Sequence, residues 1–292
     1  MRRHELTDES WAVTEPFLAP PRMGRPVRDR RQVVNRILWK LSTGAAWWDL
    51  PERYGPWKTV YERFRRWSAD GTWDRLLAHV QQRCDAVGAV DWTVTCVDST
   101  TVRAHQHAAG ACKRRPRVPG KRTTPRQHRP DEGLGRSRGG LTCKIHLAGE
   151  GGCRPLAVLI TPGQGSDAPQ FIPVMDRIRV GRLEGGRPRT RPDHVGGDKA
   201  YSSRRNRCYL RRRQIKHTIP EPRNQRANRQ SRGSRGGRPT GFDKTIYKGR
   251  NEVERTINAL KNSRAVATRY DKRAYVFHGT ITVASIRLWL RP

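Results

Sequence analysis

The chain has 292 residues and a formal net charge of +34, with 60 Lys and Arg against 26 Asp and Glu. This length suits one large domain or two small ones. No small acidic substrate requires so much positive charge, so the balance indicates a polyanionic partner, of which nucleic acid is the commonest.

Other features of the composition exclude further classes of protein. The six cysteines contain no CxxC pair, which argues against a zinc ribbon and a disulfide-stapled secreted domain. They are expected to be reduced thiols of a cytosolic protein. The start "MRRHELTDES" has no apolar segment behind its arginines, and no apolar run approaches 18 residues. Neither a signal peptide nor a membrane span is therefore expected.

Residues 1–90 are predicted to form a helical domain with its own core, because eight of the nine tryptophans lie at or before Trp92. "LTDESWAVTEPFL" begins with Thr7 as a helix cap, and "DRRQVVNRILWKLSTG" has apolar residues at helical spacing before Gly44. "WKTVYERFRRW" and "WDRLLAHVQQRC" predict two more helices. Short helices with basic outer faces fit a helix-turn-helix-like DNA-binding domain, and the alternative is a plain bundle with an aromatic core.

From Asp91 onward the pattern predicts strands and helices in alternation. "WTVTCVDSTTV" is a strand, and "LTCKIHLAGEGGCRPLAVLITPG" is a hairpin that turns at "GEGG". "DAPQFIPVMDRI" is a helix capped by Asp167, and "DHVGGDKAY" holds a short strand that ends at Asp198. A helix in "SRRNRCYLRRRQI", a strand in "KHTIP" and one long helix over "FDKTIYKGRNEVERTINALKNSR" follow. The order predicts a mixed α/β sheet with helices on its faces.

Two basic insertions, at about 111–139 and 221–241, interrupt this pattern. Residues 111–139 hold ten Lys and Arg against two acids, and residues 203–240 hold thirteen against one. From Arg223 the sequence "RNQRANRQSRGSRGGRPT" is of low complexity and is not expected to be ordered alone. Concentrated charge of one sign is costly unless a polyanion neutralises it, so DNA contact is favoured over a solvated loop.

Two glutamates in the last long helix differ in their predicted surroundings. On a helical wheel at about 100° per residue, Glu254 shares a face with Tyr247, Arg250 and Lys261, beside the apolar stripe. Glu252 is predicted to face solvent. A carboxylate beside the core needs a partner, and the simplest is an ion pair between Arg250 and Glu254 at i,i+4.

Carboxylates that converge have a second use. They can bind divalent magnesium or manganese, and the bound metal promotes in-line attack on a phosphodiester. Asp98 and Asp198 are each predicted to close a strand before a polar turn, so both are candidates to join Glu254. Each aspartate could equally serve as a turn or cap residue.

Four stretches in order carry a resemblance to a known family. They are "VDSTTVRAHQHAAGA", "SRGGLTCKIHLA", "GDKAYSS" and "YKGRNEVERTINALKNSRAVATRYDK", the last with a Tyr-x2-Arg-x3-Glu-x6-Lys pattern. With the N-terminal "LTDESWAVTEPFL" and "GAAWWDLPERYGPWKTVYERFRRW", the likeness covers nearly the whole chain. The sequence resembles bacterial insertion-sequence transposases of the DDE type, in the insertion-sequence-five group of the ribonuclease-H-like superfamily.

The resemblance implies a fold and a reaction. Residues 91–292 would form a ribonuclease-H-like catalytic domain, and residues 1–90 would recognise the element's ends. Asp98, Asp198 and Glu254 would bind two Mg²⁺ ions, with Mn²⁺ as a substitute. The implied reaction is cleavage at the ends of the element, followed by attack of the freed 3′-OH on target DNA.

The resemblance also implies partners. Tyr247, Arg250 and Lys261 would position the DNA end through its phosphates, and Lys199 and Arg264, in the same motifs, are added as predicted DNA contacts. The partner is double-stranded DNA, both element ends and target, held by a homodimer. The expected location is the bacterial cytoplasm, associated with the nucleoid.

Three rival functions stay open. A ribonuclease-H-like nuclease or resolvase would use the same acids without strand transfer. A catalytically inactive transposase relic, or another DNA-binding protein, would keep binding without cleavage. An RNA-binding protein is suggested by the arginine- and glycine-rich run, but no aromatic RNA-recognition motif accompanies it.

Overall fold

The N-terminal part of the chain is all-helical, as predicted. The computed structural model describes residues 4–18, 29–109 and 132–291, so most of the first basic insertion lies outside the described residues. Helix α1 (Asp8–Thr14) begins at Thr7, whose hydroxyl accepts a hydrogen bond from the Ser10 amide. The next helices are α2 (Arg30–Thr43), α3 (Trp57–Ala69) and α4 (Thr72–Ala86).

Local chemistry sets the bounds of α2. The Asp29 carboxylate caps the first turn by accepting the Gln32 amide at 2.9 Å. The helix ends at Gly44, which takes the left-handed conformation at φ 70°. A side chain at this position would also meet Arg264, because a Cβ added to Gly44 would lie 2.9 Å from the Arg264 Cβ. The end of α2 is therefore in close contact with the C-terminal part of the chain.

The rest of the chain forms a mixed sheet. Strands β1 (Val94–Ala104), β3 (Gly140–Gly149) and β4 (Pro155–Pro162) are antiparallel neighbours, and β3 and β4 form the predicted hairpin. Strands β5 (His194–Gly197) and β6 (Lys216–Thr218) extend the sheet in parallel with β1. The spatial order β4-β3-β1-β5-β6, with antiparallel and parallel pairs, confirms the predicted mixed α/β sheet.

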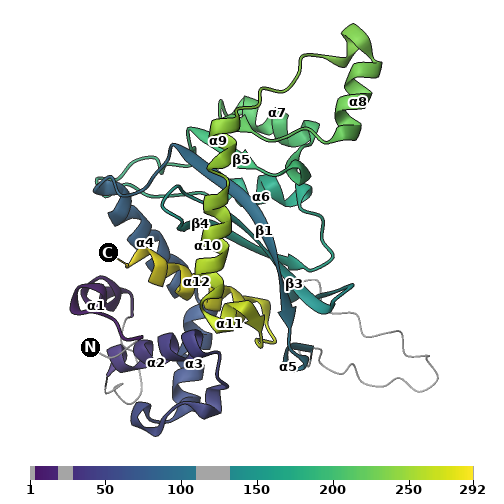
Figure 1. The fold of residues 1–292 in the computed structure, drawn as a ribbon. Coiled ribbons are helices and arrows are strands. Elements are labelled where there is room, and N and C mark those ends of the chain that lie inside the picture. The colour runs from purple at the N-terminus through teal and green to yellow at the C-terminus, as the bar shows by residue number, and fades with distance from the viewer. Residues whose placement is uncertain (1–3, 19–28, 110–131, 292) are drawn as a thin grey trace, which may run out of the picture.

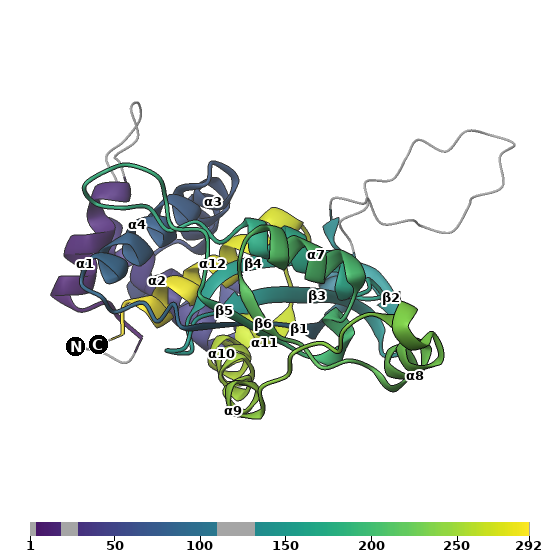
Figure 2. The ribbon, with the colours of Figure 1, turned by 90° about the horizontal axis from the view of Figure 1, so that it is seen from above.

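Helices lie on both faces of this sheet. Helix α10 lies on one face and α7 on the other (Figure 2), and α6 packs against α7, β3 and β4. Two short strands extend the sheet further: β2 pairs with β3, and β7 pairs with the end of β1. The remaining bounds are α5 (Gln106–Ala109), β2 (Gly135–Ser137), α6 (Phe171–Asp176), α7 (Arg204–Arg212), α8 (Arg223–Ser231), α9 (Lys244–Lys248), α10 (Asn251–Lys261), α11 (Arg264–Ala267), β7 (Thr268–Arg269) and α12 (Ala274–Trp289).

The prediction of one long helix before residue 265 is wrong, because the segment is divided into α9, α10 and α11 (Figure 1). Between α9 and α10 the amides of Gly249, Arg250 and Val253 bond to carbonyls three residues back rather than four. This tighter turn changes the rotation per residue, so a wheel drawn from α9 does not continue through α10.

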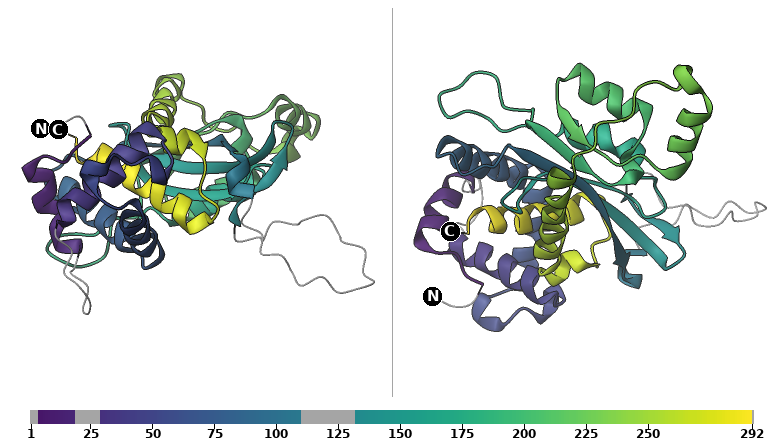
Figure 3. Two further views of the ribbon diagram at one scale, coloured as in Figure 1. Left: turned by 90° about the horizontal axis from the view of Figure 1, so that it is seen from below. Right: turned by 45° about the horizontal axis from the view of Figure 1, so that its top comes forward.

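The helical region and the sheet share one core. Helix α12 packs against α3 and α4, where it is enclosed by the N-terminal helices (Figure 3). The predicted inward position of Trp289 is confirmed, because its side chain is buried and its indole N–H donates to the Pro155 carbonyl at 2.8 Å. The expectation of a separate N-terminal core is wrong, because one continuous cluster of buried residues joins the N-terminal helices, α12 and the sheet. The domain boundary near residue 90 stays a prediction.

Two expectations about the whole chain can be compared with the described residues. The five cysteines in this part, all except Cys112, are free thiols. None of the described helices combines the length and the apolar character that crossing a membrane would need.

Gly279 provides a test of the shared core. A Cβ at this position of α12 would lie 2.1 Å from the Ser68 Oγ and 2.8 Å from the Ser68 Cβ on α3. We expect Gly279→Ala to lower the free energy of unfolding by about 1 to 3 kcal/mol, although alanine is the better helix former. Chemical denaturation measures the change. In a double-mutant cycle the cost should shrink in a Ser68→Gly background, and an equal cost there would contradict this packing.

Candidate active site

The register of two parallel strands places two aspartates side by side. The pairing of β1 with β5 ends at Val97 and Gly197. Asp98 and Asp198 are the residues that directly follow this last pair. Neighbouring strands lie about 4.8 Å apart, so the two carboxylates emerge next to each other. The prediction that Asp98 closes its strand is wrong, because antiparallel pairing with β3 carries β1 on to Ala104. Strand β5 does end directly before Asp198.

Backbone amides fix one oxygen of each aspartate. The Asp98 Oδ1 accepts the Ser99 amide at 2.7 Å, and the Asp198 Oδ1 accepts the Ala200 amide at 2.8 Å. Asp198 therefore also serves as the cap of the short 3₁₀ helix Lys199–Tyr201. The two predicted uses of this residue, cap and site, are compatible because a carboxylate has two oxygens and about four acceptor positions.

Helix α10 brings Glu254 to the aspartates through Arg250. The Arg250 Nη2 lies 2.6 Å from the Glu254 Oε1, which confirms the predicted i,i+4 ion pair. The Arg250 Nη1 also lies 3.8 Å from the Asp98 Oδ2. The side chain of Glu254 is 47% exposed while those of Arg250 and Asp98 are 21% and 19% exposed. One guanidinium thus lies between a half-buried and an exposed carboxylate.

The electrostatics of Asp98 reflect this crowding. Burial raises its pKa, and the neighbouring Asp198 and Glu254 raise it further. The Ser99 amide and the Arg250 guanidinium act in the opposite direction. Three carboxylates close together repel one another, and a cation placed among them stabilises their charged forms. Arg250 supplies one such positive charge.

The donor set fits a hard divalent cation. Carboxylate oxygens are the ligands that Mg²⁺ and Mn²⁺ prefer. Among the residues that the structure describes, no three His, Cys, Asp or Glu side chains stand close enough to hold one ion in this arrangement. The Arg250 guanidinium occupies the space between Asp98 and Glu254, so these acids would close on an ion only after Arg250 moves.

Glu252 has different surroundings from those predicted. The side chain is partly buried rather than directed to solvent, and Glu254 is the more exposed of the two. Burial raises the pKa of Glu252, with smaller contributions from Asp91 and Glu150. The prediction that Glu252 faces solvent is wrong because the buried face of α10 also includes Thr256, which lies one turn after Glu252 on the same side of the helix. Glu254 is among the charges that raise the pKa of Asp98.

Four of the five predicted DNA contacts lie near these acids in the sequence or in space. The Arg250 guanidinium carbon lies 5.8 Å from the centre of the Tyr247 ring. The Lys261 Nζ donates to the Thr101 carbonyl at 3.4 Å, three residues along β1 from Asp98, and burial lowers its pKa. Lys199 is exposed directly after Asp198. Helix α10 therefore runs alongside β1 with basic groups near both of its ends.

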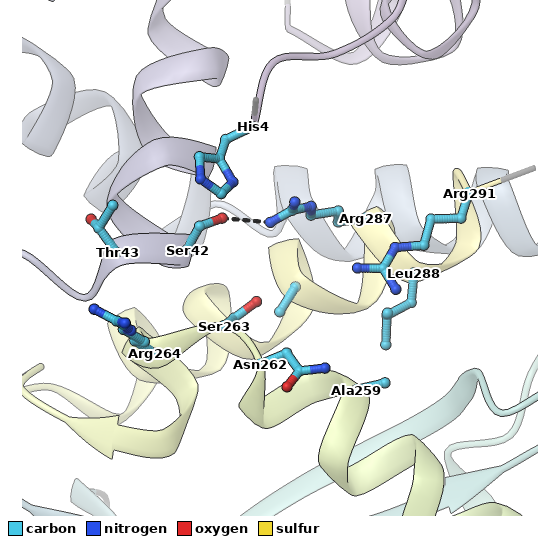
Figure 4. Close-up of a pocket in the computed structure, with 11 residues that line it drawn as sticks. His4, Ser42, Thr43, Ala259, Asn262, Ser263, Arg264, Arg287, Leu288 and Arg291 are labelled. Atoms are coloured by element: carbon cyan, nitrogen blue, oxygen red, sulfur yellow. Dashed lines mark hydrogen bonds between the residues drawn. The ribbon is translucent and has the colours of Figure 1, made fainter. Parts of the chain in front are cut away.

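The fifth predicted contact, Arg264, lies elsewhere. It lines a cavity of about 410 Å³ between α2, the α10–α11 corner and α12 (Figure 4). Ser42 and Arg287 approach each other across its upper wall through a hydrogen bond. None of the three acids lines this cavity. Arg264 is therefore separate from the acids and lies at the contact between the helical region and the sheet.

Sequence reasoning missed a polar cluster on the strand beside Asp98. The Asp167 carboxylate accepts hydrogen bonds from the Ser99 hydroxyl at 2.8 Å and from the Lys144 ammonium at 3.0 Å. The prediction that Asp167 caps the following helix is wrong, because its side chain makes no capping bond. The alternation of Lys144 and His146 on one face of β3 was the available signal, since Ser99 pairs with His146 across the strands.

His146 is the buried end of this cluster. Its side chain is 0% exposed, its Nε2 lies 2.8 Å from the Thr161 hydroxyl, and its Nδ1 lies 3.6 Å from the Asp167 carboxylate. Burial lowers its pKa to about 4, against the opposing effect of Asp167. The ring is therefore neutral in the folded protein at neutral pH.

This burial predicts a pH-dependent stability. Between the unfolded pKa of about 6.5 and the folded value of about 4, the unfolded chain binds more protons at His146 than the native protein does. Stability should therefore fall as the pH drops through this window, by about 3 kcal/mol from this group. Denaturant unfolding at a series of pH values measures it. His146→Gln should flatten the profile, and an unchanged slope in that variant would assign the effect to other groups.

Comparison with known proteins agrees with the two parts of the chain. Residues 91–289 match the family described as "Transposase DDE domain", and residues 6–77 match a family of transposases assigned to the IS4/5 group. The chain is 37% identical over 108 residues to the uncharacterized protein y4sN of Sinorhizobium fredii, which covers 36% of this chain and 82% of that protein. It is 28% identical over 152 residues to the protein of Brucella ovis assigned as transposase of insertion sequence element IS6501, covering 52% of this chain and all of that protein.

Among solved structures, the Mos1 transposase paired-end complex with left transposon end is similar at 13% identity and a TM-score of 0.25. The match covers 84% of this chain and 82% of that chain. A TM-score this low supports no conclusion about the site.

Proposed function

Because the chain belongs to the DDE-domain transposases of insertion sequences, we propose that it binds the terminal inverted repeats of its own element, cleaves the DNA there and joins the freed 3′-OH to target DNA. The observation that carries the proposal is the position of Asp98 and Asp198, one residue beyond the same strand pair, with Glu254 connected to Asp98 through Arg250.

The three acids have the chemistry that the reaction needs. DDE transposases use divalent metal, and Asp98, Asp198 and Glu254 would hold two Mg²⁺ ions, or Mn²⁺ in their place. The bound ions would supply Lewis-acid activation of the attacking oxygen and stabilisation of the leaving oxygen. Hydrogen bonds from the Ser99 and Ala200 backbone amides hold one oxygen of each aspartate in place. The second oxygen of each aspartate is left to bind a metal ion.

The basic residues around the acids would position the DNA. Lys199 follows Asp198 directly, and Tyr247 lies against the Arg250 guanidinium, so both flank the acids. In this proposal Arg250 leaves Asp98 and turns to a phosphate of the DNA end, for which its planar donors are well matched. Lys261 would contribute a second phosphate contact from the far end of α10.

The helical region would recognise the element's ends. Residues 1–90 form the proposed DNA-binding domain, and residues 91–292 the catalytic domain. Because two ends are joined to target in one event, the active species would be a homodimer on double-stranded DNA.

A cleavage and strand-transfer assay tests the assignment of the acids. The substrate is DNA that carries the element's own ends, with Mg²⁺ present. Glu254→Gln should lower the rate of end cleavage by about 10³-fold, because a ligand to the metal is lost, while DNA binding is retained. Glu252→Gln is the matched control and should cut and join as the wild type does.

Other results of this assay point to different functions. Normal cutting by Glu254→Gln would reduce Glu254 to a structural ion pair and place the catalytic acid elsewhere. Cleavage without any joining of the 3′-OH would favour a nuclease or resolvase. Binding without cleavage by the wild type would favour a DNA-binding relic.

The position of Arg250 generates a second prediction, on metal affinity. Removing the guanidinium leaves the acids without their internal cation, so Arg250→Gln should bind Mn²⁺ more tightly in the absence of DNA, by about fivefold. Titration calorimetry measures this affinity independently of turnover. Arg255→Gln, which removes a neighbouring exposed arginine of α10, is the control. Unchanged or weaker Mn²⁺ binding by Arg250→Gln would show that Arg250 does not compete with metal for the acids.

A further inference from the structure

The second basic insertion contains a regular repeat of arginine. Every third residue from position 223 to position 238 is arginine, and no Asp or Glu lies between Glu221 and Asp243. Residues 222–241 are called the arginine arm below. The repeat consists of Arg223, Arg226, Arg229, Arg232, Arg235 and Arg238.

The arm is folded rather than irregular. It forms α8 (Arg223–Ser231) and the 3₁₀ helix Gly233–Gly236, and α8 projects beyond α7, away from the N-terminal helices (Figure 1). The helix has no buried residue. A helix that buries nothing does not form for the sake of a core, so other contacts must hold it.

One side chain of α8 anchors the arm to the body of the protein, and a second pairs with the residue directly before the arm. The Ser202 hydroxyl donates to the Gln225 Oε1 at 2.8 Å, and the Gln225 Nε2 donates back to the Ser202 carbonyl at 2.7 Å. Four residues on, Arg229 forms an ion pair with Glu221 at 3.2 Å. Gln225 and Arg229 share one face of the helix because they are spaced i,i+4.

The anchor places the arm near the proposed catalytic acids. Ser202 is four residues after Asp198, with the short helix Lys199–Tyr201 between them. The arm also follows β6, which runs parallel to β5, and the C-terminal ends of parallel strands lie at the same edge of a sheet. DNA that reached Asp198 would therefore approach the edge from which the arm projects.

The other five arginines are left as uncompensated charge. All five are exposed, and within the described part of the chain none of them pairs with a carboxylate. Arg223 lies on the opposite side of α8 from Gln225, and Arg226 lies about 100° around the helix from Gln225. Five like charges repel one another, so the anchored arrangement is stabilised by a polyanion more than by solvent.

The chemistry of the arm favours the backbone of a duplex. Guanidinium groups match phosphate with two parallel hydrogen bonds, and the intervening Asn, Gln and Ser side chains add neutral donors. Residues 222–241 contain no aromatic side chain. Recognition of exposed bases in single strands depends on aromatic stacking, which the arm cannot provide.

We propose that the arginine arm is a sequence-independent clamp on the sugar-phosphate backbone of duplex DNA beside the catalytic acids. The proposal rests on the proposed function in one respect, that the DNA is the enzyme's own substrate. It adds a binding surface that the acids and the residues of the Tyr-Arg-Glu-Lys pattern do not include.

Counterion release gives a quantitative test. The dissociation constant for duplex DNA carrying the element's ends is measured over a range of salt concentrations, with a chelator present so that no cleavage occurs. One variant replaces four arm arginines with glutamine (Arg223, Arg226, Arg232 and Arg235). The charge-matched control replaces four exposed arginines before β5, at the opposite end of that strand (Arg177, Arg179, Arg182 and Arg187).

The arm variant should make the plot of log affinity against log salt shallower by about 3 to 4, since each phosphate contact contributes about 0.9 to the slope. The control should keep the wild-type slope, and replacing the same four arm residues with lysine should keep most of it. Circular dichroism checks that α8 and the fold persist in each variant.

Two results would overturn the proposal. One is a slope that changes by less than about 1, or equally in the arm variant and the control. The other is that the arm variant loses binding to single-stranded RNA but binds duplex DNA as the wild type does. Because the measurement uses no metal and no turnover, the clamp can fail while the cleavage assay succeeds, and the reverse.

Discussion

The site depends on the register between two parallel strands. The last paired residues of β1 and β5 are Val97 and Gly197. This register makes the residues that follow them, Asp98 and Asp198, neighbours in space. Residues 98 and 198 are a hundred positions apart, so no local interaction could bring them together. Only the formed sheet brings them together, and the helix that carries Glu254 packs along β1 beside them. Local chemistry, such as the Ser99 and Ala200 amides, only orients what the register has placed.

Repulsion between neighbouring groups of the same charge is the second constraint on this protein. The acids crowd one another and share the Arg250 guanidinium, while the arginine arm carries positive charge with few internal partners. Both arrangements are costly in the free protein. The first is relieved by divalent cations and the second by phosphates, so the substrate complex would satisfy both at once. The N-terminal helices, α12 and the sheet support these groups together because they share a core.

Much of the fold could be predicted from the sequence because its signals are local. The Thr7 cap, the hairpin at "GEGG" and the inward Trp289 follow from capping, turn and apolar patterns. The division of the predicted long helix into α9, α10 and α11 could not be predicted. Backbone hydrogen bonds to the carbonyl three residues back, instead of four, do not change the spacing of apolar residues in the sequence. The wheel was wrong about Glu252 for another reason, because it counted only apolar residues and the buried face of α10 also includes Thr256. The wheel nevertheless grouped Glu254 with Arg250, since that pair spans a single turn. The contacts of Asp167 with Ser99 and Lys144 are tertiary, and the shared core depends on α12 packing beside helices some 200 residues away.

The most direct measurement of the central claim is a crystal structure of the protein grown with Mn²⁺, with the ion located by its anomalous scattering. The account predicts an anomalous peak in contact with both Asp98 and Asp198, and a guanidinium of Arg250 that has moved off Asp98. A peak at other residues, or a peak at the aspartates with Arg250 still between Asp98 and Glu254, would contradict it.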